Sequence, residues 1–336
     1  MKTFLLSWWK GPDKKRAYGF LSLLLFFCVL DVVANVGFNL WQKNFFNALE
    51  QKQADVFISE IIRFIPLWFL VLFSFAGNRF IKNYISFQWR EYLTDYFSKL
   101  WFLNKSYYTI KSEFGHVDNV DQRIAQDIKE STEKLTDLTG VFLKDGLNVI
   151  TFSFILYELS KLLNFYIPGF LLYVAFLYAF LAIFATFKLG KPLIPLDQEQ
   201  EKREADFRYL LMRVHEYASD LKQAKDNSQT TKTLSSAFLF IKQNYFAILR
   251  RKFFVDSFES IHGQLNMFIP LILTSPFYFQ GLISLGVLIQ IRGMFYEVYR
   301  SLASCAYEFE KIAHTLASLN RLKELHSALI AVQENQ

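Results

Sequence analysis

The sequence predicts an all-α membrane protein with six membrane-spanning helices and long helical extensions on the cytoplasmic side. Hydrophobic residues make up 52% of the 336 residues, and 38 of them are Phe, against only 13 Gly and 7 Pro. This composition excludes a disordered or collagen-like chain. Long uncharged runs alternate with stretches that are dense in charge. The two cysteines, Cys28 and Cys305, both lie in apolar runs, which excludes a disulfide scaffold and a Cys-rich zinc module.

The uncharged runs locate the spans. A spanning helix needs about 20 apolar residues to cross a hydrocarbon core of about 30 Å. Residues 162–187 are 26 uncharged residues in succession, and residues 17–42 contain Asp31 as their one charge. The second and third runs are shorter, so polar residues are expected at the ends of those spans. The six predicted spans are residues 18–41, 58–80, 143–163, 165–188, 261–278 and 282–304.

The charge distribution predicts the orientation. With six spans, one side of the membrane carries 31 of the 37 Lys and Arg residues and the other side carries 3. The positive-rich side is expected to be cytoplasmic, so both termini lie inside. No secretory signal peptide is expected, because the first apolar run is too long and no cleavage site follows it. Trp8 and Trp9, beside basic residues, are expected to anchor the chain at the inner membrane surface.

The two long cytoplasmic segments are predicted to be helical. In residues 80–101 the apolar residues recur at roughly helical spacing, which indicates that the second span continues beyond the bilayer. Residues 196–218 carry mixed charges around one apolar stripe, which is typical of a solvated helix. Some 20 residues of helix at 1.5 Å per residue project about 30 Å. Paired spans that alternate with such extensions suggest the transmembrane half of a dimeric ABC exporter-like bundle.

Three segments carry a more specific resemblance. They are Trp89-Arg90-Glu91-Tyr92-Leu93-Thr94 followed by Asn104-Lys105-Ser106-Tyr107-Tyr108, then Asp118-Asn119-Val120-Asp121-Gln122-Arg123-Ile124, and finally Lys191-Pro192-Leu193 with Arg203-Glu204-Ala205-Asp206-Phe207-Arg208. In order and spacing they resemble the SbmA/BacA branch of the ABC transporter transmembrane superfamily and its ATPase-bearing relatives. Val120 replaces the usual Pro of the second segment. The resemblance extends over nearly the whole chain, including Asn244-Tyr245-Phe246, Ser284-Leu285-Gly286 and Asn320-Arg321-Leu322.

The resemblance implies a set of coupling or structural residues in the cytoplasmic extensions. Asp118 or Asn119 is expected to cap a helix whose first turn carries Asp121, which suits the positive end of the helix dipole. Arg123 is expected to reach acidic groups on neighbouring helices, at a joint after the first coupling helix. The alternative is an ordinary capped surface helix. The full set is Asp118, Asp121, Gln122, Arg123, Arg203, Glu204, Asp206, Arg208 and Glu216.

Two departures from the ATPase-bearing relatives favour an ATPase-free transporter. The sequence contains no G-x-x-x-x-G-K-[ST] motif to hold ATP phosphates. A Gly-Glu pair that those relatives carry near the second coupling element is absent from residues 223–227. Uphill transport would then need an ion gradient, and therefore ionisable groups within the spans.

Intramembrane charges are costly, so each one is a functional candidate. The candidates for a proton or substrate pathway are Glu297, Glu259, Asp31, His262 and Arg300. The fifth span places Glu259, His262 and Asn266 on one face. The sixth carries a polar stripe of Gln290, Glu297, Ser301, Ser304 and Glu308. In the functional interpretation, Glu259 and Glu297 line a central cavity and titrate during transport.

Each candidate also has a structural alternative. Glu297 could form a static ion pair with Arg300 or Arg292. Glu259 could be an exposed carboxylate at the inner boundary, and His262 could be a hydrogen-bonded packing residue. Asp31 could make a buried polar contact with Asn35.

The leading hypothesis is a homodimeric, SbmA/BacA-like transporter of a bacterial inner membrane that imports peptides or other bulky solutes by alternating access, driven by protons. One alternative is the permease subunit of an ABC transporter that works with a separate ATPase chain, and another is a membrane interaction or assembly protein. No nucleic-acid partner is expected, because the basic residues are interleaved with acidic ones. No enzyme activity, cofactor or metal is expected, because the sequence shows no H-E-x-x-H motif, no Ser-His-Asp order and no metal cluster. The expected organisation is an N-terminus at 1–17, a transporter domain at 18–325 and a tail at 326–336.

Overall fold

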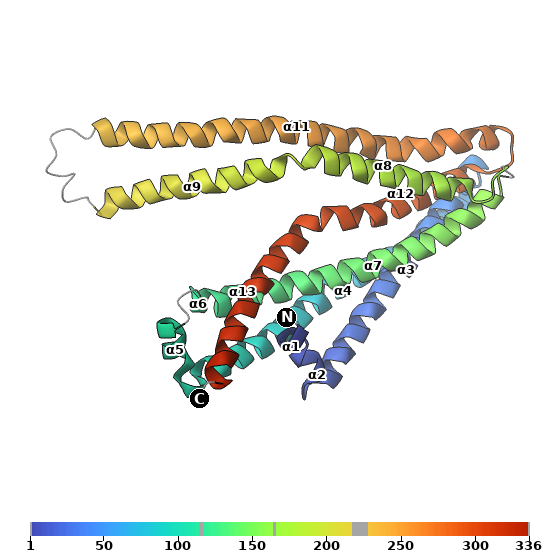
Figure 1. Cartoon of the computed structure of the whole chain (residues 1–336). Helices are drawn as coiled ribbons and strands as arrows, with labels where there is room; N and C mark the ends of the chain where they lie inside the picture. Colours follow the sequence, from blue (N-terminus) through green and yellow to red (C-terminus); the bar gives the residue numbers. More distant parts are fainter. Residues whose placement is uncertain (1, 114–116, 164–165, 217–227, 335–336) are drawn as a thin grey trace. The chain divides into compact units, whose positions relative to one another are not determined.

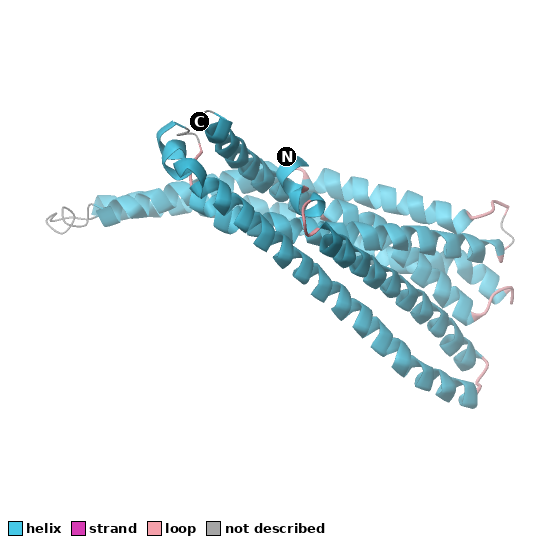
Figure 2. Cartoon of the chain, turned by 90° about the horizontal axis from the view of Figure 1, so that it is seen from below, coloured by secondary structure: helices cyan, strands magenta, loops and turns pink. Residues whose placement is uncertain are grey.

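The computed structural model describes residues 2–113, 117–163, 166–216 and 228–334, and in these residues every regular element is a helix (Figure 2). The chain divides into two compact units. The first unit contains residues 1–176 and 270–336, and the second contains residues 177–269. Each unit is described below by itself.

Two long helices, α3 (Lys14–Glu50) and α4 (Ala54–Phe102), begin the first unit. The three residues between them include Lys52 with a φ of 54°, and this short connection makes the helices antiparallel neighbours. Gly77 of α4 leaves the space that the ring of Phe27 occupies, because a Cβ there would lie 2.0 Å from that ring. Trp41 Nε1 also donates to the carbonyl oxygen of Glu60 at 2.8 Å. The two helices therefore pack closely along their length.

The predicted helical extension of the second span is confirmed, since α4 continues without a break to Phe102, while its cytoplasmic location stays a prediction. It ends in the 3-10 turn η1 (Leu103–Lys105), where Asn104 and Lys105 both have positive φ. The chain then forms α5 (Ser106–Glu113), α6 (Val120–Gln122), the π-helical turn η2 (Arg123–Asp127) and α7 (Ile128–Lys161). The last helix, α13 (Phe309–Glu334), lies against η2 and the beginning of α7 (Figure 1).

An apolar core fills the end of the first unit that is formed by α5, α13 and the end of α4. Its fully buried members come from α4, α5, α7 and α13, and they include Leu93, Phe97, Ile110, Ile128, Leu322, Leu325 and Leu329. The short N-terminal helices α1 (Lys2–Leu5) and α2 (Ser7–Lys10) add Phe4 and Trp8 to this core. The prediction that Trp8 anchors the chain at the membrane surface is therefore wrong. Its side chain is only 3% exposed, and its ring stacks on Trp89 with centroids 6.2 Å apart.

The helix α12 (Leu285–Tyr307) follows a tight turn that ends α11 (Ser228–Phe279). Gly281 has a φ of +74°, and the Leu282 and Gly281 amides donate back to the carbonyl oxygens of Phe277 and Tyr278, which is a Schellman ending. The first amides of α12 are then satisfied by α3. Leu285 N donates to Glu50 Oε2 and Gly286 N donates to Asn47 Oδ1, each at 2.9 Å.

The second unit contains the C-terminal part of α8 (Phe170–Gly190), the whole of α9 (Leu193–Glu216) and most of α11 (Ser228–Phe279). Pro192 separates α8 from α9 because proline has no amide proton to donate. Side chains of α11 bind the carbonyl oxygens on either side of the break. Arg251 Nε donates to the Leu189 oxygen at 2.8 Å, and Asn244 Nδ2 donates to the Leu196 oxygen at 2.9 Å. These bonds hold α9 beside α11 (Figure 1).

Four helical segments are long and apolar enough to cross a membrane, namely Lys14–Glu50, Ala54–Ile110, Val120–Lys161 and Phe170–Glu216. They contain the first four predicted spans, although α8 begins at Phe170 rather than at residue 165, after Gly169 with a φ of +77°. The predicted fifth and sixth spans lie in α11 and α12, which are more polar. α12 carries Arg292, Glu297 and Arg300 in its 23 residues. Six spans and the dimer stay predictions.

Candidate functional site

The first unit contains a charged cleft of about 580 Å³ between α3, α4, α7, α12 and α13. Most of its wall comes from the region where the second and third spans meet their cytoplasmic extensions. The cationic residues of the wall are Arg79, Lys82, Lys134, Lys144, Arg300 and Lys311, and the acidic ones are Asp31, Glu133, Asp137 and Asp145. Phe75 and Val141 contribute apolar surface, and Asn78, Asn83 and Ser86 contribute neutral polar groups.

One helix supplies a continuous series of charged side chains to this cleft and to the structure below it. We call this series the polar column, and it consists of Arg123, Asp127, Glu130, Lys134, Asp137, Lys144 and Asp145 of η2 and α7. Most of the spacings are three, four or seven residues, which keeps the side chains near one face of the helix. At 1.5 Å per residue the column is about 30 Å long. Its partners come from four other helices.

At the membrane end of the column, Lys144 pairs with Asp31 of α3. Lys144 Nζ lies 2.7 Å from Asp31 Oδ2, and Asn35 Nδ2 donates to the same oxygen at 3.3 Å. The predicted contact between Asp31 and Asn35 is thus confirmed. The Asp31 side chain is only 8% exposed, so the ion pair with Lys144 is what compensates this buried charge.

Next to this pair, Arg300 of α12 lies between two carboxylates. Its Nε and Nη2 donate to Glu297 Oε2 at 3.2 and 2.8 Å, and its Nη1 lies 3.9 Å from Asp145 Oδ1. The structure therefore contains the ion pair between Glu297 and Arg300 that the sequence analysis gave as one alternative. Arg292 makes no ion pair in the part of the chain that the structure describes. The role of Glu297 in a transport pathway stays a prediction.

In the middle of the column, Asp137 binds two lysines from different helices. Its Oδ1 accepts from Lys82 of α4 and its Oδ2 accepts from Lys311 of α13, both at 2.6 Å. Lys311 also pairs with Glu308 at 2.8 Å. The Lys82 side chain reaches Asp137 across Gly140, where a Cβ would lie 2.6 Å from Lys82 Cδ. A side chain larger than glycine at this position of α7 would require Lys82 to shift.

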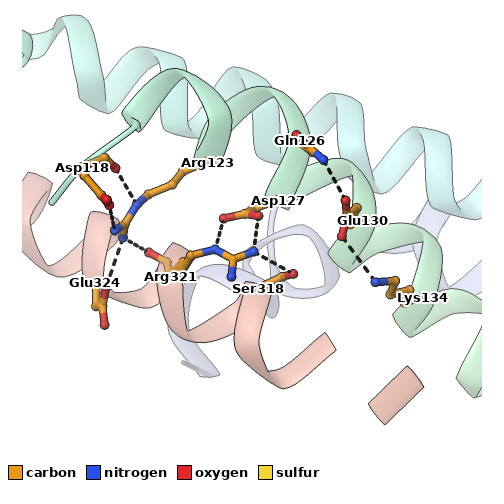
Figure 3. A network of polar contacts seen from close by, with 9 residues as sticks. All are labelled: Asp118, Arg123, Gln126, Asp127, Glu130, Lys134, Ser318, Arg321 and Glu324. Atoms are coloured by element: carbon orange, nitrogen blue, oxygen red, sulfur yellow. Dashed lines mark hydrogen bonds and ion pairs between the residues drawn. The ribbon is translucent and has the colours of Figure 1, made fainter. Parts of the chain in front are cut away.

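At the other end of the column, Arg123 and Arg321 join η2 to α13 (Figure 3). Arg123 is buried and donates to Asp118 Oδ1 at 2.9 Å, to Glu324 Oε2 at 3.1 Å and to the carbonyl oxygen of Arg321 at 2.7 Å. Arg321 in turn donates to both oxygens of Asp127, at 2.6 and 2.8 Å. The prediction that Arg123 reaches acidic groups at a joint is confirmed, with Glu324 as the acid from another helix.

This joint shifts the pKa values of its ionisable groups. The hydrogen bond from Arg123 lowers the pKa of Asp118 from its ordinary value, although burial works in the opposite direction. The hydrogen bond to Asp127 raises the pKa of Arg321. Both shifts favour the charged forms, so the joint remains an assembly of ions at neutral pH.

The prediction that the side chain of Asp118 or Asn119 caps the following helix, α6, is wrong. Asn119 occupies the N-cap position of α6, but it has a left-handed backbone (φ 46°, ψ 51°) and its side chain makes no capping hydrogen bond. The Asp118 carboxylate instead accepts from Arg123. Asp121 lies in the first turn of α6, as predicted, and both Asp121 and Gln122 are exposed. The π-helical turn η2 then brings Arg123 and Asp127 to the joint, and such turns are frequent at functional sites.

The predicted coupling residues of α9 lie in the second unit. Arg203 pairs with Glu199 at 2.8 Å and donates to the carbonyl oxygen of Phe240 on α11. Glu204 accepts from Gln200 at 3.0 Å, and Asp206 is exposed. Arg208 and Glu216 line a shallow hollow of about 320 Å³ together with Leu211, Met212 and His215. Their coupling roles stay predictions.

The predicted pathway residues of α11 also lie in the second unit. His262 is buried against the ring of Phe258, and its carbonyl oxygen accepts from the Tyr178 hydroxyl of α8. This contact fits the packing alternative for His262. Glu259 is half-buried. The predicted cavity that Glu259 would share with Glu297 stays a prediction.

Several residues that line the cleft were not among the predicted site residues. Lys144 and Asp145 lie inside the predicted third span, and together with Asp137 they belong to a series of charges that recur mostly at three- to four-residue spacing along residues 123–145. Lys82 and Lys311 lie outside that segment, and no local pattern identifies them. Among the described residues, no group of three or more His, Cys, Asp or Glu side chains is arranged to hold a metal ion.

Several buried polar groups next to the polar column have no partner. Asn148 of α7 is fully buried, and neither its oxygen nor its nitrogen has a hydrogen-bond partner among the described residues. Asn39 Oδ1 of α3 and Gln290 Oε1 and Ser301 Oγ of α12 are also buried without one. Buried polar atoms are normally hydrogen-bonded, so this interface of α3, α7 and α12 is suited to admit water or a polar ligand.

Comparisons with known proteins give the context of this site. Residues 6–279 match the family described as ABC transporter transmembrane region 2. The chain is 30% identical to the inner membrane ABC transporter ATP-binding protein YddA of Escherichia coli (strain K12), with 96% of this chain and 59% of that protein covered. It is 27% identical to the chloroplastic ABC transporter D family member 2 of Arabidopsis thaliana, with 96% and 44% covered.

A more distant similarity reaches the lysosomal cobalamin transporter ABCD4 of Homo sapiens, which is 25% identical over 64% of this chain and 33% of that protein. The chain spans about half the length of the curated relatives it matches first. These matches support an ABC exporter-like transmembrane domain, which is the coarser part of the resemblance stated from the sequence.

Proposed function

The chain belongs to the family of ABC transporter transmembrane regions 2, and on this premise we propose that it forms the membrane-spanning part of a transporter powered by an ATPase domain or subunit. This is the first alternative of the sequence analysis. It is supported by relatives whose names include an ATP-binding protein. We also propose that the protein lies in a bacterial inner membrane with both termini in the cytoplasm, and that it forms a homodimer.

The observation that carries the proposal is the connection between the cleft and the joint through one helix. α7 lines the cleft with Asp137 and Lys144, and η2 at its beginning holds α13 through Arg123 and Asp127. The short helix α5 (Ser106–Glu113) precedes this joint and contacts α13. We propose that the ATPase acts on α5, and that α13 and α7 carry its movement to the cleft.

We propose that the transported solute is bulky and partly polar, such as a peptide. A cleft of about 580 Å³ lies in the usual size range of ligand sites, about 300–1,000 Å³. Its wall combines charged groups with Phe75 and Val141. The unpartnered amides of Asn148 and Gln290 would gain hydrogen bonds from water or solute if α12 moves away from α7. A cobalamin transporter among the relatives is consistent with a large solute.

The proton-driven import by an SbmA/BacA-like protein is less well supported. Asp31 and Glu297 were candidates for proton binding, and each is held in an ion pair, with Lys144 and Arg300 respectively. Protonation of either carboxylate would have to break that pair. The charged cleft also favours a transporter over an assembly protein without transport, because an assembly role does not require such a cleft.

Transport in inverted membrane vesicles tests the proposal. Vesicles from cells that overproduce the chain with its native ATPase would be given a fluorescent proline-rich peptide, with ATP, with a non-hydrolysable analogue, or with ATP plus a protonophore. We expect peptide movement that needs ATP hydrolysis and resists the protonophore. Movement with ATP that stops when the protonophore is added would restore the proton-driven hypothesis. Vesicles without the overproduced chain serve as the control.

A further inference from the structure

Asp137 is the one side chain of the polar column that binds cations from two other helices with its two separate oxygens. Lys82 comes from α4, 55 positions earlier in the chain, and Lys311 comes from α13, 174 positions later. Both Nζ atoms lie 2.6 Å from the carboxylate. A single carboxylate therefore connects three helices at the cleft.

All three residues line the cleft, so their contacts determine how wide it is at this level. The Lys82 side chain passes over Gly140 to reach Asp137. If α4 or α13 moves away from α7, the corresponding contact must break first. The cleft cannot widen here while both lysines remain bound.

The exposure of these side chains makes the contacts reversible. Asp137 is 38% exposed, Lys311 33% and Lys82 21%. Water can therefore replace each contact, and ion pairs with this degree of exposure contribute only modest stability. Asp127 of the joint below is only 2% exposed and accepts two hydrogen bonds from Arg321. The contacts of Asp137 can thus open while the joint stays closed.

We propose that Asp137 is a positioning residue that latches α4 and α13 to α7 and keeps the cleft narrow, and that release of Lys82 and Lys311 opens the cleft. The passage of a solute through this opening rests on the proposed transport function. The latch itself is a property of the chain and needs neither nucleotide nor solute to be tested.

The charges give the latch a distinctive response to mutation. Both ammonium groups lie against the same carboxylate, so they repel each other once its charge is removed. Asp137→Asn should therefore open the cleft. Neutralising Lys82 and Lys311 as well removes the repulsion, so the triple variant D137N/K82Q/K311Q should be more closed than the single variant. Loss of packing alone predicts the opposite order.

A cysteine at position 86 reports the width of the cleft. Ser86 of α4 lines the cleft and is 6% exposed. Ser86→Cys would be introduced into a chain with Cys28→Ser and Cys305→Ala, reconstituted in lipid nanodiscs without nucleotide. The rate of labelling by a charged, water-soluble maleimide would then be measured. Asp95→Asn is the matched control, because Asp95 pairs with Lys99 on the exposed surface of α4.

We expect Asp137→Asn to raise the labelling rate about fivefold, the factor that corresponds to the upper end of the stability that a partly exposed ion pair contributes. The triple variant should label faster than the parent but more slowly than Asp137→Asn, whereas Asp137→Glu and Asp95→Asn should label within about twofold of the parent. A parental rate for Asp137→Asn, or equal rates for the single and triple variants, would overturn the latch. Either result would leave the proposed transport function standing, because no transport is measured.

Discussion

Arg123 of η2 donates a 2.7 Å hydrogen bond to the carbonyl oxygen of Arg321 on α13 (Figure 3). The side chain of Arg321 returns to the same segment and donates to both oxygens of Asp127, one turn after Arg123. The two arginines thus cross-link the same pair of helical segments in opposite directions. Neither segment can slide along the other without breaking several charge-assisted hydrogen bonds, which are stronger than neutral ones.

Asp127→Asn should destabilise this joint more than Glu324→Gln. The Asp127 side chain is 2% exposed, whereas Glu324 is 56% exposed. Arg321 is 46% exposed, so its guanidinium can be solvated by water when Asp127 is replaced. We therefore expect Asp127→Asn to lower the free energy of unfolding by only roughly 1–3 kcal/mol. For Glu324→Gln we expect less than about 1 kcal/mol. Unfolding in detergent by urea measures both, and equal losses would contradict the assignment of the joint to the buried pair.

The ion pair between Lys144 and Asp31 should respond asymmetrically to mutation. Lys144→Met leaves the Asp31 carboxylate, 8% exposed, without a cation, while Asp31→Asn leaves Lys144, 28% exposed, able to reach water in the cleft. We expect a loss of roughly 2–4 kcal/mol for the first and about 1 kcal/mol for the second. Because both lie in one pair, the double variant should be more stable than Lys144→Met alone.

The yield of folded protein and its urea midpoint in detergent check this prediction. Arg79→Gln is a matched control, since Arg79 lines the same cleft on its exposed side and makes no ion pair in the described part of the chain. If Asp31→Asn proved the more damaging change, Asp31 would have a role beyond its pairing with Lys144.

Local sequence patterns predicted the helices, but they could not predict contacts between residues that are far apart in the sequence. The helical spacing of apolar residues in 80–101 correctly extended α4, because that spacing depends only on neighbours in sequence. Asp137 has partners 55 and 174 positions away, and no periodicity identifies them. Trp8 was misjudged for the same reason. Its basic neighbours suggested a membrane surface, but Trp89, 81 positions later, covers it.

The candidate site was predicted in part. Asp31, Glu297 and Arg300 were found because charges within apolar runs are conspicuous. The joint at Arg123 was found through the resemblance of its segment. The left-handed backbone of Asn119 could not be foreseen, because Asn can either cap a helix with its side chain or adopt that conformation without capping.

Gly286→Ala should separate α12 from α3. A Cβ at Gly286 would lie 2.0 Å from the carbonyl oxygen of Lys43, and this backbone atom cannot move aside as a flexible side chain could. It would also disturb the bond from the Gly286 amide to Asn47. Overpacking of this kind costs about 1–3 kcal/mol. Gly19→Ala is the matched control, because nothing lies within 4 Å of a Cβ there.

The thermal midpoints of the two glycine variants in detergent provide the comparison. Gly19→Ala should leave the midpoint unchanged or raise it, since alanine in a helix is favoured over glycine by up to about 1 kcal/mol. A stable Gly286→Ala variant would mean that α12 does not pack on α3 as closely as described.

His326 should make the apolar core around Phe97 and Leu325 in the first unit less stable in mild acid. Its Nε2 lies 3.0 Å from the Tyr96 hydroxyl, and its ring packs against Phe4 and Tyr96 with centroids 5.3 and 5.9 Å apart. Burial lowers the pKa of His326 from its ordinary value of 6.5. The unfolded chain therefore binds more protons than the folded chain as the pH falls through about 6.5, so the free energy of unfolding decreases there.

His326→Gln can still hydrogen-bond to Tyr96 but does not titrate, so it should lose less stability than the parent protein between pH 8 and pH 5.5. The urea midpoint of each protein at the two pH values gives the comparison, and titrations that the two proteins share cancel in the difference. Asp118 also has a lowered pKa, but a lowered carboxylate pKa removes stability only below about pH 4. An equal loss for both proteins, or a parent that gains stability in acid, would show that His326 is not buried among these rings.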